Sequence, residues 1–483
     1  MNNRRKIRTR RGALLAAIVV LAVACGLLIG RSGGGPGRLL PAGGGVEGTF
    51  DPLAYAPARE REFEAAAAAG LSHVIYAKSP GGVLAAARRT AAFRPAIEAA
   101  ARTGPIDADT LEAIVMLESS GRPDVVAGTD PSAAAGLTQI VAQTGTGLLG
   151  MRIDLPASRR LGARIAAATP GAAAVLRARR ARVDQRFDPA AALAATERYL
   201  TIARGVFGRD DLAVESYHMG IGNLETAIRR YAGGGSTDPV KDVVARGDLT
   251  YARLYVDSTP LVHPAAYAWL AALGDDSATY LWRVGAAREV MRLYRTDPAG
   301  LARQAALQTA AASAELALRP PGTTPVLADA GAVAAAARAG GLVGLPASAP
   351  KLGLAGDPRL LLAPDALAAA LYMAGAVRGI APASAPLELT AGTRGADELV
   401  AASRASGGRA DRDALHATGY AFDVARSYAT PAEALALQFI LDRLQALGVI
   451  AWERHARIIH VVAGPRASLV RGVLGRAGSS GSG

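Results

Sequence analysis

The chain has 483 residues, is 51% apolar and only 5% aromatic, and carries a formal net charge of +13. This length allows two or three domains, and the positive charge favours polyanionic partners such as anionic lipid or a cell-wall polymer. The sequence shows neither zinc-finger spacing nor a basic stripe interleaved with aromatics, so we expect no nucleic-acid partner. The single cysteine, Cys25, excludes an intrachain disulfide.

The N-terminus has the pattern of an export signal. Residues 1–11 are rich in Lys and Arg, and residues 12–30 contain no charged side chain. This pattern predicts a cytoplasmic tail, a single transmembrane signal anchor and an extracytoplasmic remainder, on the periplasmic or cell-wall side of the cell membrane. A lipoprotein signal modified at Cys25 and a cleaved secretory signal are the alternatives, and both also export the chain.

Composition and periodicity divide the rest of the chain, and we expect mainly α structure followed by a small α+β domain. The expected segments are a flexible linker (31–58), a helical segment (59–104), a long helical domain (105–318), a linker with short helices (319–384), an α+β domain (385–470) and a disordered tail (471–483).

Glu118 is the first candidate functional residue. Asp109 and Glu112 have the spacing of a capping box, which predicts that a helix begins there. Glu118 lies seven residues after Leu111, so it continues the apolar face of this helix. Burial raises the pKa of a carboxyl group, and a carboxyl group that keeps its proton near neutral pH can act as a general acid.

Three motifs follow one another in an informative order. They are Glu-Ser-Ser-Gly at 118–121, Ala-Gly-Leu-Thr-Gln-Ile at 135–140 and Ser-Tyr-His-Met-Gly-Ile-Gly at 216–222. Together they resemble the soluble lytic transglycosylase family over residues 105–300. The resemblance implies a lysozyme-like helical fold, with a glutamate at the end of a helix in a cleft that binds peptidoglycan strands.

The resemblance also implies roles for individual residues. Glu118 is the expected acid/base, Ser119 and Gln139 are expected to bind substrate, and the Tyr217 hydroxyl is expected near Glu118. His218 replaces the family's Asn and is the remaining candidate substrate-binding residue.

The family needs one carboxylate and no cofactor, because the muramic acid 6-hydroxyl is the nucleophile and the product of MurNAc–GlcNAc cleavage is a 1,6-anhydro sugar. Hydrolysis assisted by a second carboxylate such as Asp130 stays open as an alternative. Glu215 lies off the face of Tyr217, and we expect it to be solvated.

A second candidate site lies near the C-terminus. His416 and Asp423 are followed by His460 on a strand-like run, and two His with one Asp suit a zinc ion with an open position. The segment 385–465 resembles the zinc D-Ala-D-Ala carboxypeptidase family, which implies that these three residues are zinc ligands.

The family's general base would lie three residues before His460, where this chain has Arg457. In the hairpin that we expect, Ile450 lies opposite His460, which would place Glu453 about 10 Å away. An active peptidase, zinc binding without catalysis and a purely structural domain therefore remain open for this region. A non-catalytic scaffold that binds the cell wall remains the alternative for the whole chain.

Overall fold

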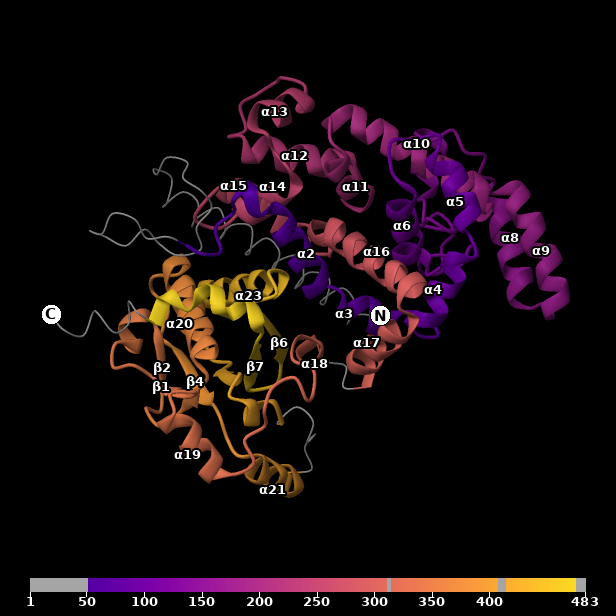
Figure 1. Cartoon of the computed structure of the whole chain (residues 1–483). Coiled ribbons are helices and arrows are strands. Elements are labelled where there is room, and N and C mark those ends of the chain that lie inside the picture. Colours follow the sequence, from indigo (N-terminus) through magenta and orange to yellow (C-terminus); the bar gives the residue numbers. More distant parts are fainter. Residues whose placement is uncertain (1–50, 311–313, 407–413, 475–483) are drawn as a thin grey trace, which may run out of the picture. The chain divides into compact units, whose positions relative to one another are not determined.

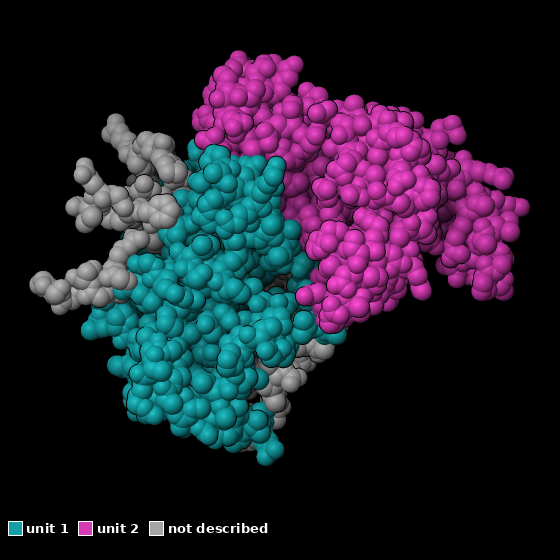
Figure 2. Space-filling model, in the orientation of Figure 1, with its two compact units in different colours: residues 1–73, 255–268, 306–483 teal, residues 74–254, 269–305 magenta. Residues whose placement is uncertain are grey.

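The computed structural model describes residues 51–310, 314–406 and 414–474 (Figure 1). The predicted cytoplasmic tail, the predicted anchor at 12–30 and most of the predicted linker lie outside the described residues. Within the described ranges, no helix combines the length and the hydrophobicity needed to cross a bilayer. The chain forms two units, coloured separately in Figure 2: residues 74–254 with 269–305, and residues 255–268 with 306–483 and the described part of 1–73.

The first of these units, which we call the helical unit, contains the Glu118 region. Its described residues form helices and only isolated β-bridges, as expected from the sequence. The helices that lie wholly within it are α4 (Val83–Ala91), α5 (Arg94–Ala101), α6 (Ala108–Ser119), α7 (Ala142–Gly147), α8 (Leu155–Ala166), α9 (Pro170–Val183), η2 (Gln185–Phe187), α10 (Pro189–Phe207), α11 (Asp210–Met219), α12 (Ile221–Tyr231), α13 (Val240–Gly247), η3 (Ser277–Thr279) and α16 (Tyr280–Thr296). Four helices cross the limits of the unit: α3 (His73–Lys78), α14 (Tyr251–Asp257), α15 (Pro264–Ala272) and α17 (Pro298–Ala310).

Helix α6 lies at the centre of this unit and packs against α5 and α16. Its apolar face belongs to a fully buried cluster formed by Ile97, Leu111, Val115, Leu137 and Leu193. The cluster includes Leu137 of the second sequence motif, so the core fixes that motif relative to α6. The helical periodicity of the sequence therefore predicted the buried face correctly.

The second unit, which we call the C-terminal unit, is built on a mixed sheet with strand order β2-β4-β5-β7-β6. Only β2 and β4 are parallel; the other neighbours are antiparallel. Its strands are β1 (Val343–Gly344), β2 (Leu354–Gly356), β3 (Leu361–Leu362), β4 (Leu387–Ala391), β5 (Ala421–Ala425), β6 (Ile450–Arg454) and β7 (Ile458–Ala463). Its helices are η1 (Pro57–Arg59), α2 (Glu60–Gly70), α18 (Ala314–Leu318), α19 (Ala330–Arg338), η4 (Ala349–Leu352), α20 (Pro364–Ile380), α21 (Ala396–Ser406), η5 (Ala414–Thr418), α23 (Pro431–Ala446) and η6 (Pro465–Val470).

Two segments that we expected to be linkers are packed into this unit. Within 319–384, β2 joins the main sheet and α20 buries most of its side chains. Within 31–58, Leu53 is 1% exposed and Asp51 accepts a hydrogen bond from Tyr372 at 3.0 Å. Gly and Pro marked turns within 319–384, but the Ala-rich stretch of α20 concealed a core helix because alanine fits both a linker and a buried face.

Candidate functional site

Glu118 lies in the last turn of α6 and is partly exposed. The helix begins two residues earlier than expected, because Asp107 is the N-cap and accepts hydrogen bonds from the amides of Asp109 and Thr110. Glu112 takes no part in capping: it is fully buried and forms ion pairs with Arg94 and Arg295. The capping box was therefore wrong, although the helix and the position of Glu118 within it were predicted correctly.

The Glu118 carboxyl group accepts a hydrogen bond at Oε1 from the hydroxyl of Tyr280, at 2.7 Å. Burial raises the pKa of Glu118 to about 7, while the Tyr280 hydrogen bond and the positive charge of Arg283 lower it. The Arg283 side chain is held in turn by an ion pair with Asp276. Glu118 can therefore both carry a proton near neutral pH and be stabilised as the anion after it gives the proton away.

Tyr217 lies beside this pair, but its hydroxyl bonds elsewhere. It donates to the carbonyl of Thr138 at 2.8 Å and lies 3.2 Å from the Thr196 hydroxyl. Its ring stacks on that of Tyr280, with the centroids 6.3 Å apart. Burial raises the pKa of Tyr217, and the charge of Glu118 raises it further. Tyr217 thus joins the second motif to the third and supports the Tyr280 ring.

Ser119 and Gln139, two further residues that we expected to bind substrate, form hydrogen bonds with the backbone. The Ser119 hydroxyl is buried; it donates to the carbonyl of Val115 at 3.2 Å and accepts from the amide of Arg122, so it fastens the turn after Glu118. Gln139 has a positive φ of 52° and donates from its side chain to the carbonyl of Gly136 at 2.9 Å.

His218 is exposed and stacks on Tyr280 with the ring centroids 5.2 Å apart, and its Nδ1 lies 3.0 Å from the Ser277 hydroxyl. Partial desolvation of the ring lowers the pKa of His218, which favours the neutral form. His218 therefore lies at the same tyrosine that contacts Glu118.

Glu215 was expected to be solvated, but it is fully buried. Its Oε2 accepts a hydrogen bond from the backbone amide of Leu281 at 2.8 Å, and burial raises its pKa well above the usual value. The side-chain spacing was read correctly, but both sides of this short helix are covered. Because Leu281 follows Tyr280 directly, Glu215 fixes the first turn of α16.

Sequence reasoning missed Tyr280 and Arg283. Both lie on α16, and Tyr280 is 162 positions from its partner Glu118. Tyr280 and Arg283 lie three residues apart on one face of this helix, but no local pattern connects them with Glu118.

The comparison with known families covers the same part of the chain. Residues 95–237 match the family model described as the transglycosylase SLT domain. This region is similar to lytic transglycosylases. The SLT match contains Glu118, Gln139 and Tyr217 and ends before α16, so Tyr280 lies outside it. It supports peptidoglycan as the substrate and a glycan-cleaving activity in general. No curated protein matches the chain.

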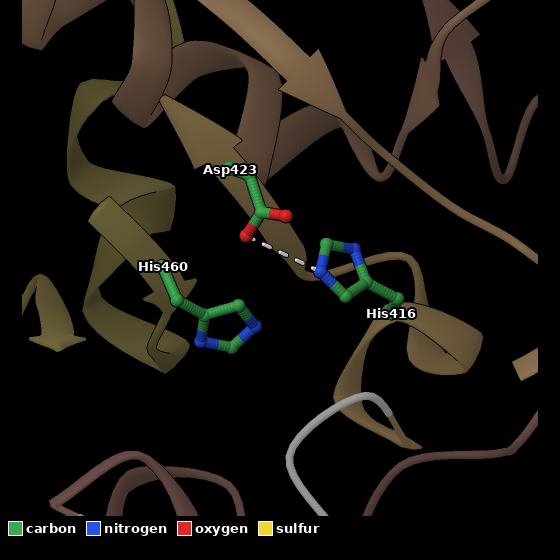
Figure 3. A group of neighbouring side chains, drawn as sticks. All are labelled: His416, Asp423 and His460. Atoms are coloured by element: carbon green, nitrogen blue, oxygen red, sulfur yellow. Dashed lines mark ion pairs between the residues drawn. The ribbon is translucent and has the colours of Figure 1, made fainter. Parts of the chain in front are cut away.

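The second candidate site lies in the C-terminal unit. His416 comes from η5, Asp423 from β5 and His460 from β7, and the three side chains converge in Figure 3. Each residue offers one ligand atom, and these atoms all lie within 4.8 Å of one another. All three residues are buried, with exposed fractions of 1%, 8% and 5%. The structure thus brings the predicted ligand set together.

The donor chemistry of this set fits a metal ion. His416 Nδ1 lies 2.8 Å from the carbonyl of Gly392, which leaves Nε2 directed at Asp423 Oδ1 over 3.5 Å, too far for a good hydrogen bond. Asp423 Oδ1 is buried and makes no hydrogen bond within the described residues. The neighbouring histidines lower the pKa of Asp423 against the effect of burial. A buried carboxylate oxygen that faces two imidazoles is a suitable ligand for a divalent cation.

The register of the last hairpin differs from our expectation. Ile450 pairs with Ala463, and Glu453 pairs directly with His460. Asp423 pairs with His460 from the other side, so these three side chains lie on one face of the sheet. The estimated separation of about 10 Å was wrong because the register of the hairpin is shifted by three residues from the one that we assumed. Arg457, which lies three residues before His460, is exposed.

Proposed function

We propose that the helical unit cleaves the MurNAc–GlcNAc bond of peptidoglycan with a 1,6-anhydro product, and that Glu118 is its single acid/base. The SLT match supports the reaction class. The Glu118–Tyr280 contact is the observation that carries the residue assignment, because it is made to a carboxyl group whose pKa of about 7 lies close to neutral pH.

One carboxyl group suffices for both proton transfers. Glu118 first donates its proton to the glycosidic oxygen, and the bond from that oxygen to C1 breaks. The resulting carboxylate then removes the proton from the muramic acid C6 hydroxyl, whose oxygen attacks C1 and closes the anhydro ring. Glu118 is protonated again at the end, and the hydroxyl of Tyr280 stabilises its anionic intermediate state through a charge-assisted hydrogen bond.

The alternative of hydrolysis through Asp130 finds little support. The Asp130 side chain is 60% exposed, pairs with Arg159 at 3.2 Å and accepts a hydrogen bond from the amide of Ser132. These contacts hold it in a surface turn. A base that positions water must be held against the reacting carbon, whereas these contacts hold Asp130 at the surface.

The test is the variant Glu118→Gln, which keeps the shape of the side chain and removes the proton that it transfers. We expect the formation of 1,6-anhydro-muropeptides from purified sacculi to fall by about 10²–10⁴-fold while glycan binding is retained. Glu289→Gln is the matched control, because Glu289 is exposed on α16 and pairs with Arg292. Unchanged turnover in Glu118→Gln would end the assignment, and reducing-end products in the unmodified protein would favour hydrolysis.

Localisation forms part of the same proposal. Peptidoglycan lies outside the cytoplasmic membrane, and the uncharged segment 12–30 after a basic N-terminus is the sequence feature that supports export. We propose a single-pass anchor with both units on the outer side. Protease treatment of intact and permeabilised spheroplasts checks this, since degradation only after permeabilisation would contradict it.

As a second function, we propose that His416, Asp423 and His460 bind zinc. The convergence of their ligand atoms within 4.8 Å supports this assignment. Bound zinc would supply a Lewis acid at this position. Zinc analysis of the full-length protein beside the His416→Ala variant tests it, because equal metal content in both proteins would contradict the assignment.

A further inference from the structure

A carboxylate from outside the predicted peptidase-like segment contacts the candidate metal centre. Glu315, on the short helix α18, lies 2.7 Å from Nδ1 of His460, to which it is 145 positions distant in the sequence. Glu315 is 1% exposed. Burial of a carboxylate costs free energy unless a partner compensates for it, and here one partner is a candidate ligand histidine.

Helix α18 is firmly packed against the face of the sheet that carries His460. Leu316 packs on the hydrophobic cluster that η5, β5 and β7 form. Leu318 covers Gly464, where an added Cβ would come within 2.8 Å of its side chain. Arg319 donates to the carbonyl of Ala463 at 2.6 Å. These contacts hold the backbone next to Glu315, so the position of its carboxylate is set by packing.

We propose that Glu315 is the positioning residue of this metal centre, an inference that rests on the zinc binding proposed above. Its carboxylate accepts the Nδ1 hydrogen of His460, which fixes the tautomer and leaves Nε2 as the ligand atom. The carbonyl of Gly392 does the same for His416. The two imidazoles therefore present the same nitrogen to the metal, one oriented by a backbone carbonyl and the other by a carboxylate.

The experiment compares zinc affinities in the full-length protein by competition with a chromophoric chelator. We expect Glu315→Ala to bind zinc about 10–100-fold more weakly. Glu315→Gln should lose less, because its amide oxygen still accepts the Nδ1 hydrogen but carries no charge. Glu388→Gln is the matched control, since Glu388 is exposed on β4 of the same unit, and its affinity should stay within about twofold of the unmodified protein.

A second readout separates orientation from general damage to the fold. In the metal-free protein, ¹⁵N–¹H correlation spectra of the histidine side chains should show His460 protonated on Nδ1 in the unmodified protein and in Glu315→Gln. They should show a mixture of tautomers in Glu315→Ala. If Glu315→Ala does not fold, the zinc affinity of Glu315→Gln alone tests the positioning role: a weaker affinity supports it and an unchanged affinity contradicts it.

The outcomes distinguish the two proposals. Zinc that binds equally well to His460→Ala, or that does not bind to the unmodified protein, would overturn the metal site and this inference with it. Zinc that requires His460 but binds with unchanged affinity to both Glu315 variants would overturn only the positioning role. Weaker zinc binding in both Glu315 variants, with the larger loss in Glu315→Ala, supports the positioning role.

Discussion

Tyr280 donates a hydrogen bond of 2.7 Å to the carboxyl group of Glu118, and the two residues are 162 positions apart. Tyr280 is the first residue of α16, and the amide of the next residue, Leu281, is held by the buried carboxyl group of Glu215. The surroundings of the candidate acid therefore depend on three separate stretches of sequence. Only the stretch that contains Glu118 has an obvious catalytic residue.

The variant Tyr280→Phe should slow turnover and shift its pH dependence. Loss of a hydrogen bond to a charged group costs about 1.5–3 kcal/mol, which corresponds to about 10–100-fold in kcat if the anion of Glu118 forms in the rate-limiting step. Because the Tyr280 hydrogen bond lowers the pKa of Glu118, its removal should move the alkaline limb of the kcat profile to higher pH. Tyr294→Phe, on the same helix, is the control, and an unchanged profile in Tyr280→Phe would show that the contact has no part in catalysis.

The pH dependence of the unmodified protein is a separate prediction. The proposed first step needs the protonated form of Glu118, whose pKa of about 7 is raised chiefly by burial. The protonated fraction falls as the pH rises through this value, so kcat for anhydro-muropeptide release should be highest below pH 7 and fall about tenfold per pH unit above it. Rates measured from pH 5 to 9 on one sacculus preparation check this. A profile that stays flat through pH 9 would contradict Glu118 as the acid.

Local pattern predicted much of the helical unit and of the last strands. The spacing of Leu111 and Val115 with Glu118 identified the face of α6, and the runs around Asp423 and His460 identified β5 and β7. These features depend on periodicity within one element, which the sequence contains directly.

The features that could not be predicted depend on contacts between distant elements. Tyr280 and Glu315 reach their partners across more than a hundred residues, and no local spacing encodes such pairs. The predicted register of β6 and β7 was wrong, because register depends on the turn that joins the strands. In the observed register Glu453 lies opposite His460 instead of at a distance from it. The burial of Glu215 escaped for the same reason, since other elements cover its helix.

The loop of the second motif provides a stability prediction. Gly136 has a φ of +83°, and a Cβ there would lie 1.8 Å from the carbonyl oxygen of Arg186. Arg186 is itself buried, pairs with Asp184 and donates to the carbonyls of Pro131 and Ala133, so it has little freedom to move. Gly136→Ala should therefore destabilise the helical unit by at least about 2 kcal/mol, from backbone strain and steric clash together.

Gly150→Ala is the matched control for this substitution. Gly150 also has a positive φ, of +65°, but an added Cβ would meet nothing within 4 Å. Gly150→Ala should therefore lose stability from backbone strain alone, by about 1 kcal/mol. Denaturant unfolding of both variants separates the two contributions, and equal losses of stability would mean that the loop yields to the clash.

Glu197 predicts how the stability of the helical unit depends on pH. It is 3% exposed, and burial raises its pKa from 4.5 to about 7, with a smaller opposing effect from the backbone of Ile106. In the unfolded chain the group ionises near 4.5, whereas in the folded chain it stays protonated up to about 7. The contribution of Glu197 to the free energy of unfolding is therefore constant below pH 4.5. It becomes less favourable as the pH rises from 4.5 to 7 and is constant again above that range.

The variant Glu197→Gln removes this dependence. A shift of this size corresponds to about 3 kcal/mol, so the loss of unfolding free energy between pH 4.5 and 8 should be smaller by about that amount in the variant. The test compares how the free energy of unfolding changes with pH in the two proteins, because a buried glutamine changes stability equally at every pH. Hydrogen–deuterium exchange of α10 at both pH values measures the effect, with Glu225→Gln as the partly exposed control on α12. Parallel pH profiles of the unmodified protein and Glu197→Gln would show that Glu197 is ionised in the folded protein at neutral pH.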